Sequence, residues 1–317
     1  PIGFFIWHLD DYDVFTETIT DVYNRKGEFI GKKTLAPFDG MPSINDWIIE
    51  TRNKPNEMKI GFMSCRSHDF SNVNYNFIMN DKAQMKSPRG SWVTDYNVKE
   101  CTIYIAVCHS IEATWLNDRD QFLYPNDGWK TDLEFQSDCL AYTLFNNNIQ
   151  AAQGTNHWIP FTEQEVDAKE AFKSHFMSDY IRGKSKTGQK RTQTEQQIPF
   201  DDSPIMAGQN GASSSCQASN ATTQQPNVPI AYSPEAQAVM EAGKALWRYY
   251  HEQPEAIADA ALYDIRLHFQ GVNDKGKMNT GSQDEHYNLL MAELRQSLKV
   301  LAQKLEPKVY EYGFLKK

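Results

Sequence analysis

The segment from Ser203 to Pro234 constrains the fold more than any other part of this chain of 317 residues. It contains no charged residue, no aromatic residue lies between Phe200 and Tyr232, and Ser, Gln, Asn, Ala and Thr dominate. Such a composition cannot bury enough apolar surface to offset the conformational entropy lost on ordering. We therefore expect a flexible polar linker over 182–231, with folded parts on either side.

The part before the linker, residues 1–181, mixes strand and helix patterns. The β-rich run from Thr16 to Leu35 surrounds the turn Asn24-Arg25-Lys26-Gly27, where Gly27 can supply the positive φ of a hairpin turn with a bulge. Further strand candidates are "KIGFMSC" and "NYNFIM". These patterns predict a mixed α/β domain.

Three helix starts follow in the same part of the chain. Asn97-x-x-Glu100 resembles a capping box, Asp132 can cap a second helix, and Thr162-x-x-Glu165 opens a third. The third is predicted to end before Gly183, with its apolar residues roughly on one face. These residues are Val166, Phe172, Phe176 and Tyr180.

The part after the linker, residues 232–317, is predicted to be a helical domain. Ser233-Pro234 opens one helix, Pro254 a second that stops at Gly271, and Ser282-x-x-Glu285 a third. The last helix carries an apolar stripe, which a small antiparallel bundle would bury and which could otherwise be an exposed docking face. Its residues are Met291, Leu294, Leu298, Leu301 and Leu305. The predicted fold class is α+β: a mixed α/β domain, a low-complexity linker and a C-terminal helical bundle.

Charge is distributed unevenly over the chain. The net charge is −9, and residues 101–181 alone carry four Lys/Arg against twelve Asp/Glu, so this region should repel phosphate backbones. Residues 182–191, in contrast, carry five cations and no acid. No apolar run approaches the ~20 residues of a membrane span. The five cysteines are odd in number and lack Cys-x-x-Cys spacing, which favours a reducing cytoplasm over a disulfide framework or zinc site.

One stretch concentrates Trp and Asp, "ATWLNDRDQFLYPNDGWKTDLEF" at 113–135. Asp118-x-Asp120 followed by Asn126-Asp127-Gly128 offers hard oxygen ligands, but the spacing matches no calcium loop. We expect a structural role, with Asn117, Asp118 and Asp127 capping turns and helix starts. The aromatic residues that should pack beneath them are Trp115, Phe122, Tyr124 and Trp129.

Motifs for catalysis are weak. A Mg²⁺-dependent nuclease of the PD-(D/E)xK type needs an Asp and a Glu-x-Lys on adjacent strands, and Asp46 with Glu57-Met58-Lys59 satisfies the letters. Matches this short arise by chance in chains of this length. Gly-x-Ser-x-Gly and a phosphate-binding Gly-rich loop are both absent.

Several longer strings resemble a known family. "PIGFFIWHLD", "DVYNRKGEFIGKKT", "IEATWLNDRDQFLYPNDGW", "DCLAYTLFNNN", "NHWIPFTEQEV", "ALYDIRLHFQG" and "KVYEYGFLK" are similar to the C-terminal portion of large bacterial adenine-specific DNA methyltransferases of restriction-modification systems. The resemblance spans the chain except for about 182–231. It implies that residues 1–9 form a strand of a missing N-terminal catalytic domain.

The family's own motifs are missing from this chain. Such enzymes bind S-adenosylmethionine through a Gly-containing loop and hold the flipped adenine with an Asn/Asp-Pro-Pro-Tyr/Phe tetrapeptide. No Pro-Pro dipeptide and no Gly-x-Gly loop occur here. We therefore expect this chain to be inactive and to have no catalytic, cofactor-binding or metal-binding residue of its own, while the parent enzyme uses S-adenosylmethionine.

The resemblance implies a role in target recognition, with double-stranded DNA and the missing catalytic domain as partners. Two cationic segments are the candidate DNA contacts. Their residues are Lys82, Lys86, Arg89 and Trp92 in the first, and Arg182, Lys184, Lys186, Lys190 and Arg191 in the second. The alternatives are a scaffold or subunit-docking module without DNA contacts, which the net charge favours, and the nuclease of Asp46, Glu57 and Lys59.

Overall fold

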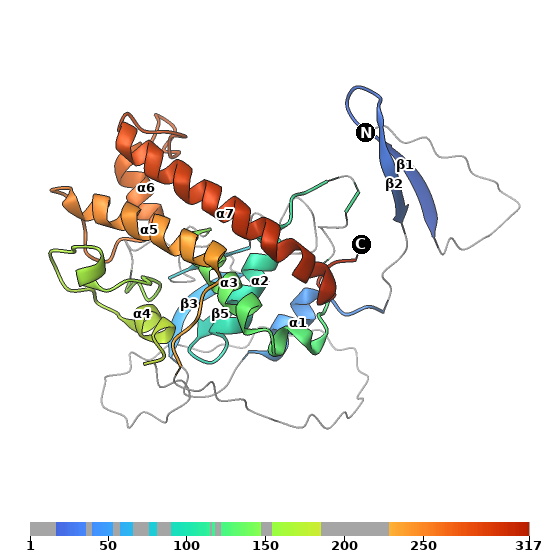
Figure 1. Cartoon of the computed structure of the whole chain (residues 1–317), viewed down its shortest axis with the longest axis horizontal. Helices are drawn as coiled ribbons and strands as arrows, with labels where there is room; N and C mark the ends of the chain where they lie inside the picture. Colours follow the sequence, from blue (N-terminus) through green and yellow to red (C-terminus); the bar gives the residue numbers. More distant parts are fainter. Residues whose placement is uncertain are drawn as a thin grey trace, which may run out of the picture.

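The computed structural model describes most of the chain and shows a mixed α+β fold (Figure 1). The predicted strand at residues 1–9 lies outside the described residues, as does most of the predicted linker. The described ranges are 17–35, 40–52, 58–65, 76–80, 90–114, 116–117, 122–146, 154–184 and 228–316.

A three-stranded antiparallel sheet forms one side of the body. Its order is β4 (Phe77–Met79), β3 (Lys59–Ser64) and β5 (Gly90–Thr94). The register between β3 and β5 shifts at Ile60. The backbone carbonyl of Ile60 there accepts a hydrogen bond from the indole Nε1 of Trp158 at 2.8 Å, which pairs a buried backbone group next to the irregularity.

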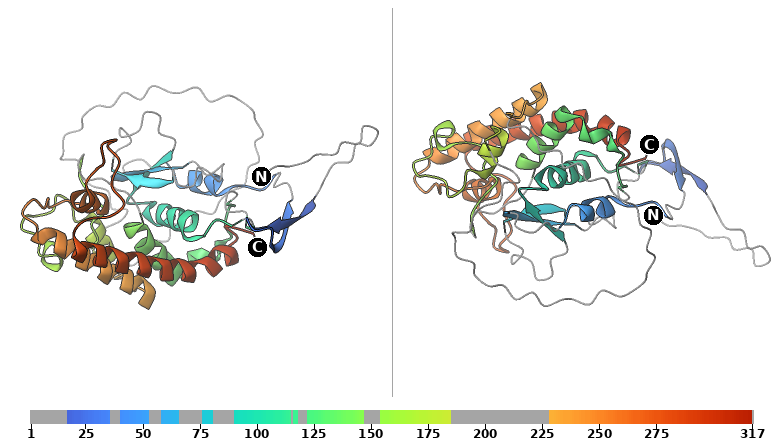
Figure 2. Two further views of the ribbon diagram at one scale, coloured as in Figure 1. Left: turned by 90° about the horizontal axis from the view of Figure 1, so that it is seen from above. Right: turned by 90° about the horizontal axis from the view of Figure 1, so that it is seen from below.

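Two buried helices lie behind this sheet. They are α2 (Val98–Ser110) and α3 (Leu133–Phe145), and most of their residues are buried on every face. A helix that is apolar all round needs neighbours on all sides. Figure 2 shows them: the sheet and α1 (Ile44–Glu50) form one outer layer, α2 lies inside it, and α3 with the C-terminal helices completes the other side.

Three helices form the C-terminal part of the chain: α5 (Pro234–Glu252), α6 (Leu262–Gln270) and α7 (Glu285–Glu311). Helices α5 and α7 cover α3, and α7 contacts α2 and α5 as well. Gly243 in α5 permits the close approach to α3, because a Cβ there would lie 2.1 Å from the Phe145 ring. The apolar stripe of α7 is thus covered within the chain, and one cluster of buried side chains extends from Ile44 to Leu315.

Ion pairs fasten α7 to α3 and α5. The Nζ atom of Lys304 lies 2.6 Å from Glu134, 3.0 Å from Asp138 and 3.2 Å from Glu235. Desolvation by burial acts to lower the pKa of Lys304, but hydrogen bonds to Glu134 and Asp138 outweigh it and raise this pKa. One turn later, Lys308 lies 3.1 Å from Asp132.

The residues after α7 return to the first layer. The backbone carbonyl of Phe314 accepts from Leu123 N at 2.8 Å, and Asn126 Nδ2 donates to the carbonyl of Glu311, 185 residues away. Phe314 is fully buried, with its ring edge-to-face against Trp47 of α1. Phe314 and Leu315, near the end of the described chain, are therefore part of the core.

Several helix starts are confirmed and others are wrong. Asp132 caps α3 and Ser233 caps α5 through their side chains, as predicted. Asn97 precedes α2, but its side chain accepts from Thr94 N instead of capping the helix. Helix α7 is capped by Asp284 and not by Ser282, because the Asp284 carboxylate accepts from Tyr287 N.

Two predicted helices are shorter than expected. The Thr162–Glu165 capping box is present, but it opens only a single turn, η4 (Glu163–Glu165), and α4 (Phe176–Ile181) starts later. Asp167 has φ +54°, which breaks the helix between the two. The chain after Pro254 likewise turns before α6 begins at Leu262, while Gly271 ends that helix as predicted.

The predicted hairpin is confirmed. Strands β1 (Thr18–Tyr23) and β2 (Phe29–Leu35) pair antiparallel, with a register shift at Val22/Tyr23 and Gly27 at φ +79° in the turn. The two strands form a sheet of their own, and Figure 1 shows them standing apart from the body.

Candidate nucleic-acid interface

The tip of the β1–β2 hairpin is a rigid turn that exposes two cations. The Asn24 side chain accepts from Lys26 N at 2.8 Å and from Glu28 N at 3.0 Å, and it donates to the Glu28 carboxylate at 2.6 Å. Arg25 and Lys26 are exposed and form no ion pair with any residue whose position the structure gives. The only acid of the turn is thereby engaged, and the two cations face solvent.

The strands of the hairpin add two lysines. Lys32 lies 3.8 Å from Asp21 on the opposite strand, a solvent-exposed pair of little energetic weight. The Nζ atom of Lys33 donates to the backbone carbonyl of Asn117 at 3.2 Å. The free cations of the hairpin are therefore those at its tip, and Lys33 ties the ribbon to the body.

Aromatic side chains flank the tip. Tyr23 and Phe29 face each other across the strands, with ring centroids 5.7 Å apart in an edge-to-face arrangement. Their side chains are 55% and 54% exposed, although rings of this size are usually buried. Ile19, which lies in β1 four residues before Tyr23, is 62% exposed.

The turn held by Asn117 contacts the middle of strand β2. The Asn117 side chain accepts from Thr114 N at 3.2 Å and donates to the carbonyl of Glu112 at 2.8 Å, which confirms its predicted role in holding a turn. Leu116 packs against Gly31 of β2, where a Cβ would meet its side chain at 3.0 Å. This contact orients the ribbon.

The remainder of the Trp- and Asp-rich stretch is largely structural. Phe122 and Trp129 are buried and Tyr124 is half-buried, as predicted. Asn126, not Asp127, caps the turn η3 (Asp127–Lys130) by accepting from Gly128 N. The two other residues with a predicted role lie outside the described residues; they are Trp115 and Asp118.

Trp92, which we predicted as a DNA contact of the first cationic segment, lies in strand β5. The Nζ atom of Lys59 lies 4.7 Å from the centroid of its ring, and Phe62 packs edge-to-face at 5.4 Å. Both partners come from β3, so Trp92 contributes to the packing of the sheet. The cations predicted beside it lie outside the described residues; they are Lys82, Lys86 and Arg89.

Arg182 is engaged within the protein. It forms a salt bridge with Glu165 and donates to the carbonyl of Ser178 at 2.8 Å. Burial opposes the charged form of Glu165, but hydrogen bonds from Thr162 and Arg182 hold the pKa of this carboxyl below its ordinary value. Lys184 is exposed just after α4. The rest of the second cationic segment lies outside the described residues; it comprises Lys186, Lys190 and Arg191.

The nuclease arrangement is contradicted at Asp46. This residue lies in helix α1, where its carboxylate accepts from the backbone and hydroxyl of Ser43 to close a capping box, and it is not on a strand beside Lys59. Glu57 lies outside the described residues. Within the ranges described, no group of three or more His, Cys, Asp and Glu side chains could hold a metal ion.

Comparisons with protein-family models, with curated proteins and with solved structures find no match for this chain. None of the described helices is both long and apolar enough to cross a membrane. The sequence predicted the β1–β2 hairpin as a structure, but we did not name it there as a candidate DNA contact. The adjacent cations in its turn, Arg25 and Lys26, were the available indication, but the exposure of both faces follows only from its position outside the body.

Proposed function

We propose that this chain helps to position duplex DNA as the non-catalytic C-terminal portion of an adenine-specific DNA methyltransferase. In this proposal a separate catalytic domain, which the family resemblance implies, transfers the methyl group from S-adenosylmethionine to adenine. The hairpin β1–β2 is the part of the chain that approaches the DNA. It would supply contacts that orient the duplex and need not read its sequence.

The observation that carries the proposal is the isolated two-stranded ribbon with unpaired cations at its tip. The major groove of B-DNA is about 12 Å wide and admits such a ribbon. Arg and Lys side chains are the usual partners of phosphate oxygens on the groove edges. Arg25 and Lys26 are therefore suited to contact the backbone when the ribbon enters the groove.

The acidic body does not preclude this contact. The body touches β2 at Gly31 through Leu116, and three residues at about 3.4 Å each put Gly31 roughly 10 Å from Glu28 at the edge of the turn. This distance exceeds the Debye length of about 8 Å at physiological ionic strength. The acids beside this contact, such as Glu112 and Glu306, are then partly screened at the tip. The extended shape thus supports binding through the hairpin despite a net charge of −9.

The test is fluorescence-anisotropy binding of the chain to duplex DNA across a salt series, with charge reversal of Arg25 and Lys26 to Glu. Each lost phosphate contact reduces the slope of log affinity against log salt by about 0.9, so we expect a change of about 2. The double reversal should also weaken binding at every salt concentration.

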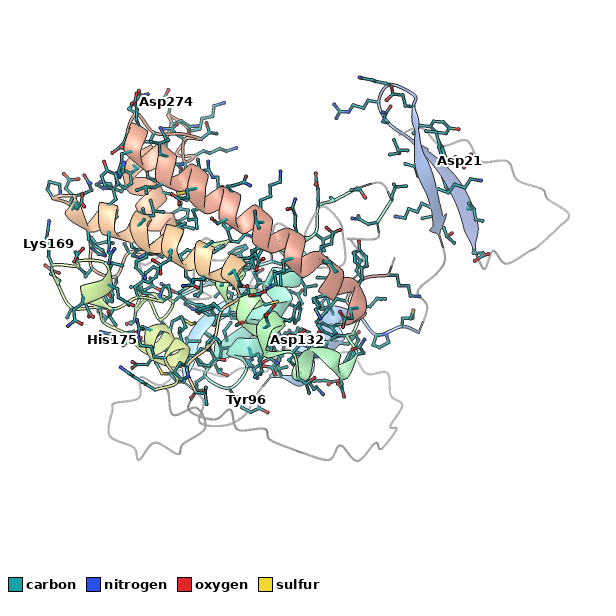
Figure 3. The ribbon with its side chains drawn as sticks, in the orientation of Figure 1. Asp21, Tyr96, Asp132, Lys169, His175 and Asp274 are labelled. Carbon is teal, nitrogen blue, oxygen red and sulfur yellow. The ribbon has the colours of Figure 1, made fainter. Side chains whose placement is uncertain are left out.

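The chain provides a matched control in a second turn of the same design. Asn273 accepts from Lys275 N and Lys277 N, each at 3.0 Å, and Gly276 has φ +70°. Figure 3 shows that this turn, marked by Asp274, lies far from the hairpin, marked by Asp21. Reversal of Lys275 and Lys277 makes the same change in charge. An equal loss in both variants would mean that net charge, and not the hairpin, governs binding.

A second candidate is a scaffold that holds the catalytic domain or a sister subunit without contacting DNA. The ion-pair cluster of Lys304 supports it, because three acids on α3 and α5 fix α7 in place and make the body a rigid unit. The net charge also favours this candidate. Absence of DNA binding at low salt would refute the hairpin proposal and leave the scaffold.

A further inference from the structure

We propose that Tyr23 and Phe29 stack on an unpaired base, so that the hairpin prefers duplex DNA in which one base has left the stack. This inference rests on the proposed function and adds to it the kind of DNA site that the tip selects. It follows from the position, exposure and chemical surroundings of the two rings.

The register places both rings beside the turn. Tyr23 is the last residue of β1, Phe29 is the first of β2, and the two are direct cross-strand partners. Their edge-to-face contact holds each ring in a defined orientation while more than half of each side chain stays accessible. Two ordered aromatic rings at the end of a ribbon form a platform that costs little entropy on binding.

Cations stand next to this platform. Arg25 and Lys26 occupy the turn between the rings, and the only carboxylate of the turn, Glu28, is bound by Asn24. Aromatic side chains beside free cations are the combination with which proteins hold unpaired nucleotides, because rings stack on bases and cations contact the phosphates. A fully paired duplex offers the cations their partner but hides the base faces from the rings.

A protein partner fits this surface less well. A buried aromatic side chain covers about 150–250 Å², so two half-exposed rings offer on the order of 200 Å². Each partner of a stable protein interface contributes about 800 Å². The ion pair between Asp21 and Lys32 also lies between Ile19 and the rings in the register, so the apolar residues form no continuous patch.

The experiment compares two duplexes of one sequence, in which a single 2-aminopurine is either paired or placed opposite an abasic site. The whole chain should bind the second duplex about tenfold more tightly, as stacking of one base on aromatic rings allows. Binding should also quench the 2-aminopurine fluorescence in the second duplex only. Tyr23→Leu and Phe29→Leu should each remove the preference while keeping the affinity for paired DNA.

Ile19→Ala is the control, because it removes an exposed apolar side chain at the far end of the same strand. Equal binding of both duplexes by the wild-type chain overturns the base-stacking inference and leaves the proposed function intact. No binding of either duplex at low salt overturns the proposed function as well. Loss of concentration-dependent self-association in the Leu variants, without a change in DNA preference, would instead assign the rings to contact with a second copy.

Discussion

The Lys304 cluster allows a quantitative test of how the C-terminal helix is held. Lys304→Met keeps the aliphatic side chain and removes the charge that pairs with Asp138, whose own side chain is only 2% exposed. The Asp138 carboxylate then keeps the Ser233 hydroxyl, at 2.6 Å, as its remaining side-chain partner. A buried carboxylate that loses its cation is a costly group.

The expected cost follows from the exposure of the lysine. Removing one partner of a fully buried ion pair costs about 3–5 kcal/mol, and a hydrogen bond to a charged group contributes about 1.5–3 kcal/mol. Because the Lys304 side chain is 28% exposed and water screens it in part, we expect about 2 kcal/mol. The apparent Tm should fall by roughly 4 °C for a chain of this size.

The pH dependence identifies the group responsible. Burial already raises the pKa of Asp138 above its ordinary value of 3.8, and loss of Lys304 raises it further. A carboxyl group whose pKa is raised by folding stabilises the fold below its unfolded pKa and loses that contribution as pH rises through the folded value. The loss of unfolding free energy in Lys304→Met, relative to the wild-type chain, should therefore be largest at pH 7 and should shrink as pH falls toward 4.

The assay is urea unfolding, followed by circular dichroism, at pH 7 and at pH 4.5. Lys299→Met is the control, since Lys299 is exposed on the same helix and forms no ion pair with a described residue. Two results would contradict this reasoning: Lys304→Met and Lys299→Met unfold at the same urea concentration at pH 7, or the loss of stability in Lys304→Met does not change with pH.

Two further substitutions probe the packing of the helices and the sheet. Gly243→Ala should destabilise the fold by about 1–3 kcal/mol in urea unfolding, because the new methyl group would lie 2.1 Å from the buried ring of Phe145. An unchanged urea concentration at the midpoint of unfolding would show that the ring can move away. Trp158→Phe should lower the free energy of unfolding by about 1–3 kcal/mol in the same assay, because the buried carbonyl of Ile60 loses its donor. A smaller loss would indicate that another group donates to this carbonyl.

Local chemistry made the sequence-based predictions succeed where they did. Ser233 before a proline, Asp132 before an apolar run, and glycines at the positive-φ positions 27 and 271 act on their own neighbours. Such effects depend on a few residues and can be read directly from the chain. The hairpin and the starts of α3 and α5 were predictable for this reason.

Distant partners explain the failures. The residues after Thr162 have helical spacing, yet Glu163 accepts from Phe172 N at 2.8 Å and Asp259 accepts from Lys173 N at 2.8 Å, which hold the chain in an irregular path. The pairing of Arg182 with Glu165 depends on this path as well. A charge count cannot show that a cation already has an internal partner.

The insertion of residues 312–315 into the first layer also has a consequence for the order of folding. Asn126 and Glu311, which bond to each other, are 185 residues apart. At 5–20 residues per second, a ribosome needs roughly 10–40 s to add that length of chain. The layer around α1 and η3 cannot reach its final packing during that time. A nascent chain therefore leaves Trp47 without its neighbour Phe314 until synthesis has passed the last helix, and this interval is when it most needs protection from aggregation.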